Sequence, residues 1–438
     1  MGLFDKLKKK ETAAPAAAPD SPALEKFYED AATCLRYYPS GCFVFCRTSV
    51  GNIGAINETY GRGSGDKVLD AAAAAITDTS VSGEQYHTLI ARDRSKFVSM
   101  MRYEDEEDLQ NKLTLLHERF KHIGEVLPEN PHIYMHTGYF PTEGKLLDMT
   151  VKEMVARAKI AESDASKRTH DSIVRYTDQL RISAAEDEQM AADMEEALAK
   201  KQFAVCLQPR FGMEDGNVIA AKIVSRWLHP KKGVIGSYRY IPLFVKNGFI
   251  IKLDTYLFEQ ACVILRKWID KGRTPVPLSL NAPRMIITDK RYMESYVSLK
   301  NKYKIPDGLC ELEFSERLVD DAKLTIGEVF DYFRENGFLI SIENFGMGNR
   351  SVETITEFHP DSIKLSANYF EDGMPDEEQQ EKMKLYIDTA KDAGVQTIAT
   401  GVPGSCEQLV RDLGCDVLQG TSGADPMPVN EFERAYLA

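Results

Sequence analysis

The sequence predicts an α/β protein in which a smaller α/β domain precedes a (β/α)₈ TIM barrel. The chain has 438 residues, enough for two or three domains, and its apolar fraction of 43% is ordinary for chains that form sizeable cores. From residue 202 to the end, short apolar runs alternate with helical patterns, and there are eight such runs. Eight strands separated by helices are typical of a TIM barrel.

The eight strand candidates also mark where a site would lie. They are Phe203–Pro209, Val218–Trp227, Pro277–Asn281, Leu309–Phe314, Phe338–Glu343, Ser362–Leu365, Gln396–Ala399 and Val417–Gly420. In a TIM barrel the polar residues at the C-terminal ends of the strands form the active site. Here those ends carry Arg226, Asn281, Glu313, Glu316, Glu343, Asn344, Lys364, Thr400 and Gln419.

The first half of the chain has a mixed order of elements. We expect strands at Gly41–Cys46, Ser95–Met101 and His132–Tyr139, and an alanine-rich helix at Asp66–Ile76. This order indicates an α/β or α+β domain over residues 24–177. A charged, alanine-rich segment with helical periodicity follows, and we interpret residues 178–201 as the helix connecting this domain to the barrel domain, residues 202–438.

Residues 1–23 predict a flexible tail. Its first ten residues set Leu3, Phe4 and Leu7 against four lysines, and the remainder is rich in alanine and proline. A short apolar face binds membranes only marginally, so a solubilising tail is the favoured interpretation, and weak peripheral membrane contact through residues 1–10 is the alternative.

The composition excludes several classes of protein. A formal net charge of -13 argues against broad binding of nucleic acid. No stretch approaches the roughly 18 apolar residues of a membrane span, and no signal peptide opens the chain, so we expect a cytoplasmic protein. The eight cysteines lack the spacing of zinc ligands, and we expect reduced thiols.

The second half resembles the EAL family of cyclic di-GMP phosphodiesterases. The resemblance runs over nearly all of residues 200–430 and rests on many short motifs in the family's order and spacing. These are Gln208-Pro209, Arg226-Trp227, His229-Pro230, Tyr240-Ile241-Pro242, Asn247-Gly248, Leu253-Asp254, Leu280-Asn281, Glu313-Phe314-Ser315-Glu316, Phe345-Gly346-Met347-Gly348, Lys364 and Gln419-Gly420. The resemblance implies an EAL-type modified barrel.

The family's metal site is changed in this chain. The resemblance implies two divalent cations held by carboxylate and carbonyl oxygens, and of these ligands Asn281 and Glu313 remain. The E-A-L triplet is replaced by Lys222-Ile223-Val224, so a metal-binding glutamate has become a lysine. The other replacements are Glu343 and Asn344 for two aspartates, Thr400 and Pro403 for two glutamates, Val245 for a glutamate and Ser366 for an aspartate.

These replacements predict a site without metal. An ammonium about 4 Å from another unit charge of the same sign costs on the order of 4 kcal/mol at an effective dielectric near 20, and a divalent ion doubles that. We therefore expect no metal cofactor and no enzymatic activity. Because buried charges persist only when paired, we also expect Lys222 to neutralise Glu313 and Glu343.

The pocket residues point to a nucleotide ligand. The resemblance implies cyclic di-GMP as the ligand, with Arg226 suited to pair with a phosphate. Ser237 and Pro403 depart from the family's pocket and argue against binding. The candidate ligand-binding residues are Gln208, Arg226, Asp254, Asn281, Glu313, Lys364 and Gln419.

The first domain resembles GGDEF diguanylate cyclases through the stretch Asn57–Leu69, N-E-T-Y-G-R-G-S-G-D-K-V-L. In that family a metal-binding aspartate stands on the preceding strand, and Ser49 takes its place here. The glycine-rich hairpin is replaced by Asp93–Phe97, whose bulky residues block close approach of a triphosphate. We therefore expect no cyclase activity and a structural role for Asn57 and Asp66.

The sequence thus predicts a catalytically inactive GGDEF–EAL regulatory protein that binds cyclic di-GMP and signals through protein contacts. A ligand-free interaction scaffold and a residual phosphodiesterase are the alternatives. We expect a homodimer or hetero-complex, because the loop Phe345–Gly348 lies near a dimer surface in the family that the chain resembles. The sequence does not identify the protein partner.

Overall fold

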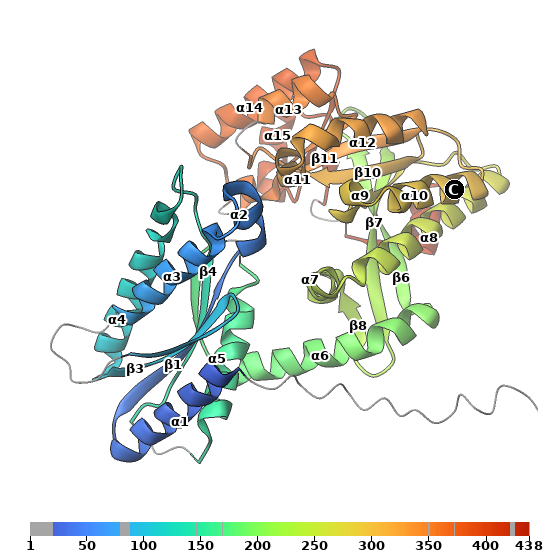
Figure 1. Cartoon of the computed structure of the whole chain (residues 1–438). Coiled ribbons are helices and arrows are strands. Elements are labelled where there is room, and N and C mark those ends of the chain that lie inside the picture. Colours follow the sequence, from blue (N-terminus) through green and yellow to red (C-terminus); the bar gives the residue numbers. More distant parts are fainter. Residues whose placement is uncertain are drawn as a thin grey trace, which may run out of the picture. The chain divides into compact units, whose positions relative to one another are not determined.

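The computed structural model describes residues 21–78, 88–144, 148–168, 170–348, 351–371, 373–420 and 425–437. The predictions for residues 1–20 lie outside this range. The chain divides into two compact units, the first ending at Glu188 and the second beginning at Gln189 (Figure 1). This division falls inside helix α6 (Asp178–Ala199), the helix that the sequence predicts as the connection between domains.

The first unit is built on a five-stranded mixed sheet. Its order is β2-β3-β1-β4-β5, with β1 antiparallel to β3 and β4 and only β4–β5 parallel. The strands are β1 (Cys42–Val50), β2 (Leu89–Asp93), β3 (Lys96–Tyr103), β4 (Met135–Pro141) and β5 (Ser172–Arg175). The helices are α1 (Pro22–Tyr37), α2 (Ile53–Tyr60), α3 (Ser64–Thr77), α4 (Glu106–Phe120), η1 (Ile123–Val126) and α5 (Val151–Ala165).

The alternation of side chains along β1 explains how this sheet is covered. Phe43 and Phe45 pack with α1 and α5, whereas Val44 and Cys46 pack with α4. Successive side chains of a strand point to opposite faces, so both faces of β1 are buried and the strand is apolar throughout its first half.

The second unit is a closed barrel of eight strands. Strand β7 (Val218–His229) is followed around the barrel by parallel strands, and β6 (Phe203–Gly212) closes it by pairing with β7 and with the last strand, β14 (Val417–Gln419). The strands between are β9 (Leu278–Asn281), β10 (Cys310–Ser315), β11 (Phe338–Phe345), β12 (Ser362–Leu365) and β13 (Gln396–Thr400). All eight predicted barrel strands are confirmed, and their ends differ by up to three residues.

Strand β6 departs from a regular TIM barrel, because it runs antiparallel to both of its barrel neighbours. Two short strands, β8 (Gly233–Gly236) and β15 (Met427–Pro428), extend the sheet from β7 and β6. This arrangement is the modified barrel that the resemblance implies.

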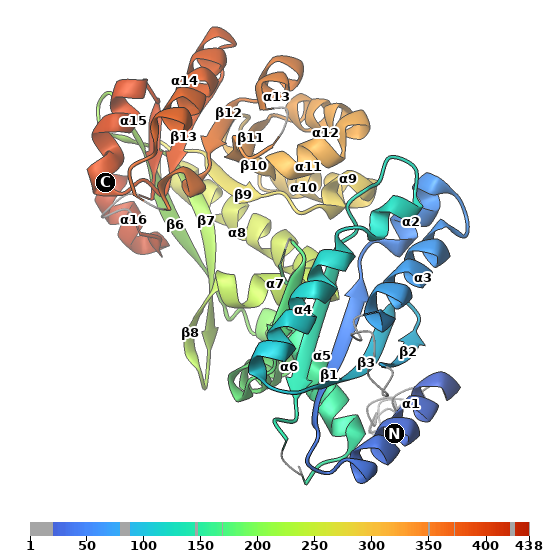
Figure 2. The same ribbon diagram turned by 90° about the vertical axis from the view of Figure 1, so that its left-hand side faces the viewer.

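Helices surround the barrel and bury one continuous apolar core with its strands (Figure 2). The helices are α7 (Ser237–Asn247), α8 (Ile250–Asp270), α9 (Met285–Thr288), α10 (Lys290–Lys302), α11 (Glu316–Asp321), α12 (Lys323–Glu335), α13 (Ser351–Phe358), η2 (Ala367–Phe370), α14 (Glu377–Asp392), η3 (Gly404–Cys406), α15 (Glu407–Leu413) and α16 (Val429–Tyr436). Within the described residues, we find no helix with the length and apolar character to cross a membrane.

Candidate functional site

Lys222 enters the barrel from β7. Ala221, Ile223 and Trp227 on one face of this strand belong to the apolar core, so alternation places Lys222 and Arg226 together on the other face. In the sheet, Lys222 is paired with Gln208 of β6 and with Ser279 of β9.

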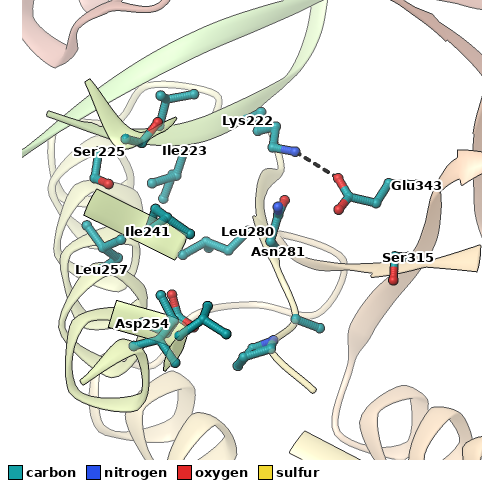
Figure 3. Close-up of a pocket in the computed structure, with 16 residues that line it drawn as sticks. Lys222, Ile223, Ser225, Ile241, Asp254, Leu257, Leu280, Asn281, Ser315 and Glu343 are labelled. Carbon is teal, nitrogen blue, oxygen red and sulfur yellow. Dashed lines mark hydrogen bonds and ion pairs between the residues drawn. The ribbon is translucent and has the colours of Figure 1, made fainter. Parts of the chain in front are cut away.

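Glu313 on β10 is fully buried and is surrounded by positive charge. Its Oε2 atom lies 2.6 Å from Nζ of Lys222 and 2.8 Å from Nζ of Lys364. Nζ of Lys222 also lies 3.1 Å from Oε2 of Glu343 on β11 (Figure 3). The predicted pairing of Lys222 with the two glutamates is present in the structure.

Sequence reasoning missed the inner half of this network. Arg210 of β6 is 2% exposed, pairs with Oε1 of Glu313 and approaches the carboxylate of Glu311 at 2.7 and 2.8 Å. Ser279 donates to Oε1 of Glu313 at 2.5 Å. The signal was the spacing of Glu311 and Glu313, because residues two apart on a strand share a face and two inward carboxylates require buried cations.

The charges of this network balance. Three cations, Arg210, Lys222 and Lys364, face three carboxylates, Glu311, Glu313 and Glu343. Burial disfavours the charged form of Glu313, but the three cations hold its pKa well below the usual range. Burial also opposes the charge of Lys222, but the two glutamates beside it raise its pKa.

Lys364 holds its proton more weakly than Lys222 does. Burial, with the neighbouring cations Lys222 and Arg210, lowers the pKa of Lys364 to about 7, although Glu313 opposes this shift. The side chain is almost fully buried, and Glu313 is its ion-pair partner within the described residues.

A pocket opens beside Lys222 at the C-terminal ends of the first barrel strands (Figure 3). It encloses about 430 Å³, within the range of roughly 300–1,000 Å³ that is typical of small-molecule sites. Ile241, Leu257 and Leu280 contribute to its apolar wall. The polar lining residues are Lys222, Ser225, Ser237, Asp254, Asn281, Ser315 and Glu343.

Asp254 of α8 lies in this apolar surrounding. Burial raises the pKa of Asp254 to about 8. A carboxyl group with such a pKa carries its proton at neutral pH and can donate as well as accept a hydrogen bond.

The predicted ligand-binding residues Gln208, Arg226 and Gln419 are not among the residues that line this pocket. The Gln419 amide donates to Oε1 of Gln208 at 3.0 Å and accepts from Nε of Arg210 at 3.1 Å, so these side chains are tied into the interior network. Nη1 of Arg226 donates to the carbonyl of Ser225 at 3.2 Å, and its guanidinium has no carboxylate partner in the described part of the chain.

Two predicted metal-site positions stay outside the cluster. Asn344 is exposed and has a φ of 56°, a left-handed conformation that asparagine tolerates better than most residues. It sits at the register shift between β11 and β12. The Thr400 hydroxyl donates a hydrogen bond to the backbone carbonyl of Leu365 at 2.8 Å.

The donor set does not fit the divalent cations that the family resemblance implies. Both oxygens of Glu313 are already taken by cationic or hydroxyl donors, and a hard cation would have to displace two ammonium groups from Oε2. Among the described residues, no cluster of three or more His, Cys, Asp or Glu side chains has the arrangement of a metal site.

The GGDEF-like stretch of the first unit is engaged in structural contacts. Oδ1 of Asn57 accepts from the backbone N–H of Gly65 at 2.9 Å, and Asp66 pairs with Arg92 at 2.8 Å. Arg94 occupies the turn of the β2–β3 hairpin with a φ of 58°. These contacts join α2 to α3 and α3 to β2.

The chain belongs to the EAL domain family, because the family model of the EAL domain matches residues 191–426, more than half of the chain. The bifunctional diguanylate cyclase/cyclic di-GMP phosphodiesterase MucR of Pseudomonas aeruginosa is 22% identical over 86% of this chain and 55% of that protein. The cyclic di-GMP phosphodiesterase NbdA of the same organism is 26% identical over 68% of this chain and 38% of that protein. The chain thus spans about half or less of the length of these relatives.

Solved structures agree on the fold. The Vibrio cholerae LapD S helix–GGDEF–EAL structure, bound to c-di-GMP, superposes with a TM-score of 0.63 at 17% identity and covers 90% of this chain and 92% of that one. The chain is therefore an EAL-domain protein that shares the fold of this structure.

The prediction that the chain is not an enzyme is contradicted by these relatives. MucR and NbdA, at 22% and 26% identity, are named as cyclic di-GMP phosphodiesterases. The prediction treated each replaced ligand position as a loss of activity, whereas these two relatives are named as enzymes.

Proposed function

We propose that the chain is a cyclic di-GMP receptor, which binds the dinucleotide in the barrel pocket beside Lys222 and transmits its bound state through protein contacts. The observation that carries this proposal is the pocket itself: an apolar wall with hydrogen-bonding groups at its edge, at the ends of parallel strands. The LapD structure, which shares the fold, is a complex with c-di-GMP.

The lining suits a purine base. Leu257 and Leu280 offer apolar contact to the faces of the ring, and the Asn281 amide can pair with its edge. A protonated Asp254 would add a donor to the same pocket. Hydrogen-bond groups held in an apolar wall give orientation and specificity to such a site.

The phosphates require a cation that is not already neutralised. Lys222, Lys364 and Arg210 are matched by three carboxylates, whereas the Arg226 guanidinium has no acidic partner among the described residues. Arg226 is on the same face of β7 as Lys222, four residues further toward the strand's C-terminal end. Arginine is well suited to a phosphate because its N–H groups form a planar fork.

Hydrolysis of cyclic di-GMP is the second candidate, and the names of MucR and NbdA favour it. Hydrolysis would use the same pocket and the same Arg226 side chain as binding does in the receptor proposal. Chromatography of the incubated ligand, with Mg²⁺ or Mn²⁺ present, separates the two, because hydrolysis yields the linear dinucleotide and binding alone leaves the ligand intact.

Isothermal titration of the full chain with cyclic di-GMP tests the proposal. We expect saturable binding, weakened about tenfold or more in Arg226→Ala, since a hydrogen bond to a charged group contributes about 1.5–3 kcal/mol. Arg434→Ala is the matched control, because Arg434 is an exposed arginine of the same unit, on α16. Absence of heat with the native protein at micromolar concentrations, or equal loss in both variants, rejects the proposal.

A further inference from the structure

The carboxylates of Glu313 and Glu343 come from neighbouring strands and meet at one ammonium group. Nζ of Lys222 lies 2.6 Å from the first and 3.1 Å from the second, and the lysine lines the pocket together with Glu343 and Asn281 (Figure 3). A single positive centre held between two carboxylates is the arrangement that a bound cation would produce.

We infer that Lys222 is a built-in cation, which makes ligand binding in this pocket independent of divalent ions and blocks an otherwise competent cation site. The part of this inference that concerns the ligand rests on the proposed function. The part that concerns the cation site does not, because it can be tested on the protein alone.

The charges explain both parts. A divalent ion near Glu313 and Glu343 would lie close to the Lys222 ammonium and be repelled by it. Exchange of Lys222 for glutamate removes one of the two ammonium groups at Oε2 of Glu313 and adds a third carboxylate beside the exposed amide of Asn281. Carboxylate and amide oxygens in such number are what hard divalent cations require.

Thermal unfolding with and without millimolar Mn²⁺ tests the cation site in three proteins: the native chain, Lys222→Glu and Lys232→Glu. Lys232 lies exposed in the turn before β8 and serves as the matched control. We expect Lys222→Glu to melt lower than the native chain without metal, by roughly 6–20 °C, because a buried pair is replaced by repulsion. Mn²⁺ should recover much of this loss in Lys222→Glu and leave the other two proteins unchanged.

Three results would overturn the inference: a native chain that Mn²⁺ stabilises as strongly as Lys222→Glu, a Lys222→Glu variant without response to Mn²⁺, or one that melts like the native chain. If Lys222→Glu does not fold, titration of the native chain with Mn²⁺ decides the matter, since micromolar binding contradicts a blocked site and no binding supports it. Lys222→Met removes the charge without adding a ligand, so it should melt lower and gain less from Mn²⁺ than Lys222→Glu.

The part of the inference that concerns the ligand is tested by titrating the native chain with cyclic di-GMP, once in EDTA and once in Mg²⁺. We expect dissociation constants that agree within about twofold, since the cation is supplied by the chain. Binding that is lost in EDTA overturns the inference. Absence of binding in both buffers overturns the proposed function instead, and the unfolding experiment then stands as the separate test of the cation site.

Discussion

The carboxyl group of Asp254 lies where solvent stabilises its ionised form only poorly. The residue lies half-buried on α8 in the pocket wall, near Ile250 and Leu257, and its pKa is raised to about 8 by burial. An unfolded chain would ionise the same group near pH 3.9. Between these values the folded protein holds a proton that the unfolded protein releases, so the stability of the fold decreases as the pH rises through this window.

Asp254→Asn should remove this pH dependence. We expect the melting temperature of the variant, relative to the native chain, to increase between about pH 5 and about pH 8, because the amide carries no charge at either pH. Asp270→Asn on the same helix is the control, since Asp270 is exposed. A difference between Asp254→Asn and the native chain that stays constant with pH would contradict the assignment.

Residue by residue, the sequence revealed the positions that carry a family motif. The pairing of Lys222 with Glu313 and Glu343 could be predicted, because a lysine replaces a known ligand beside them. The spacing of Glu311 and Glu313 indicates two carboxylates on one face, but it does not identify Arg210 as their partner, which lies about a hundred residues away along the chain. Contacts of that range depend on the register of strands, which a local pattern does not contain.

At the scale of elements, helix α5 touches strand β4 backbone to backbone. A Cβ atom added at Gly138 would lie 1.9 Å from the backbone nitrogen of Glu162 and 2.2 Å from the carbonyl oxygen of Ala158. The glycine therefore fixes how closely this helix packs on the sheet.

Gly138→Ala should force α5 away from the sheet and destabilise the first unit by about 1–3 kcal/mol or more, as overpacking does. Urea unfolding of the full chain measures this loss. Gly54→Ala is the control, because a methyl group added at Gly54 would meet no atom within 4 Å and alanine favours its helix, α2. Equal stability of Gly138→Ala and Gly54→Ala would show that the contact is looser than described.

Elements were predicted best where they are buried on both sides. The barrel strands read as apolar runs because helices or the barrel interior cover both faces. The apolar pattern of strand β1 predicts an end at Cys46, yet the strand continues to Val50 through polar residues. Thr48 and Thr137 are hydrogen bonded at 2.8 Å across β1 and β4, an interaction that apolar periodicity does not reveal.

At the scale of the whole molecule, the two units have separate cores. One apolar cluster fills the barrel, and three others belong to the first unit. The resemblance implied a modified barrel, but the antiparallel direction of β6 could not be predicted from its own residues, since the direction of a strand follows from partners far away in sequence.

Separate cores predict separate unfolding transitions. Calorimetry of the native chain should resolve two, with Gly138→Ala lowering one and Lys222→Glu the other. Cyclic di-GMP should raise only the transition that Lys222→Glu lowers, because a ligand stabilises the unit that binds it. A single transition that both substitutions shift as a whole would contradict this.

Strand β6 also sets the order in which the barrel can assemble. It is the first barrel strand to be synthesised, and it pairs with β14 and β15 near the other end of the chain. Until β14 and β15 emerge from the ribosome, one edge of β6 has no neighbouring strand. Arg210 likewise lacks its ion-pair partners until Glu311 and Glu313 have been synthesised. Pairing over such a distance is slow, so the nascent barrel exposes an open strand edge, a feature that favours aggregation, until its last strand is synthesised.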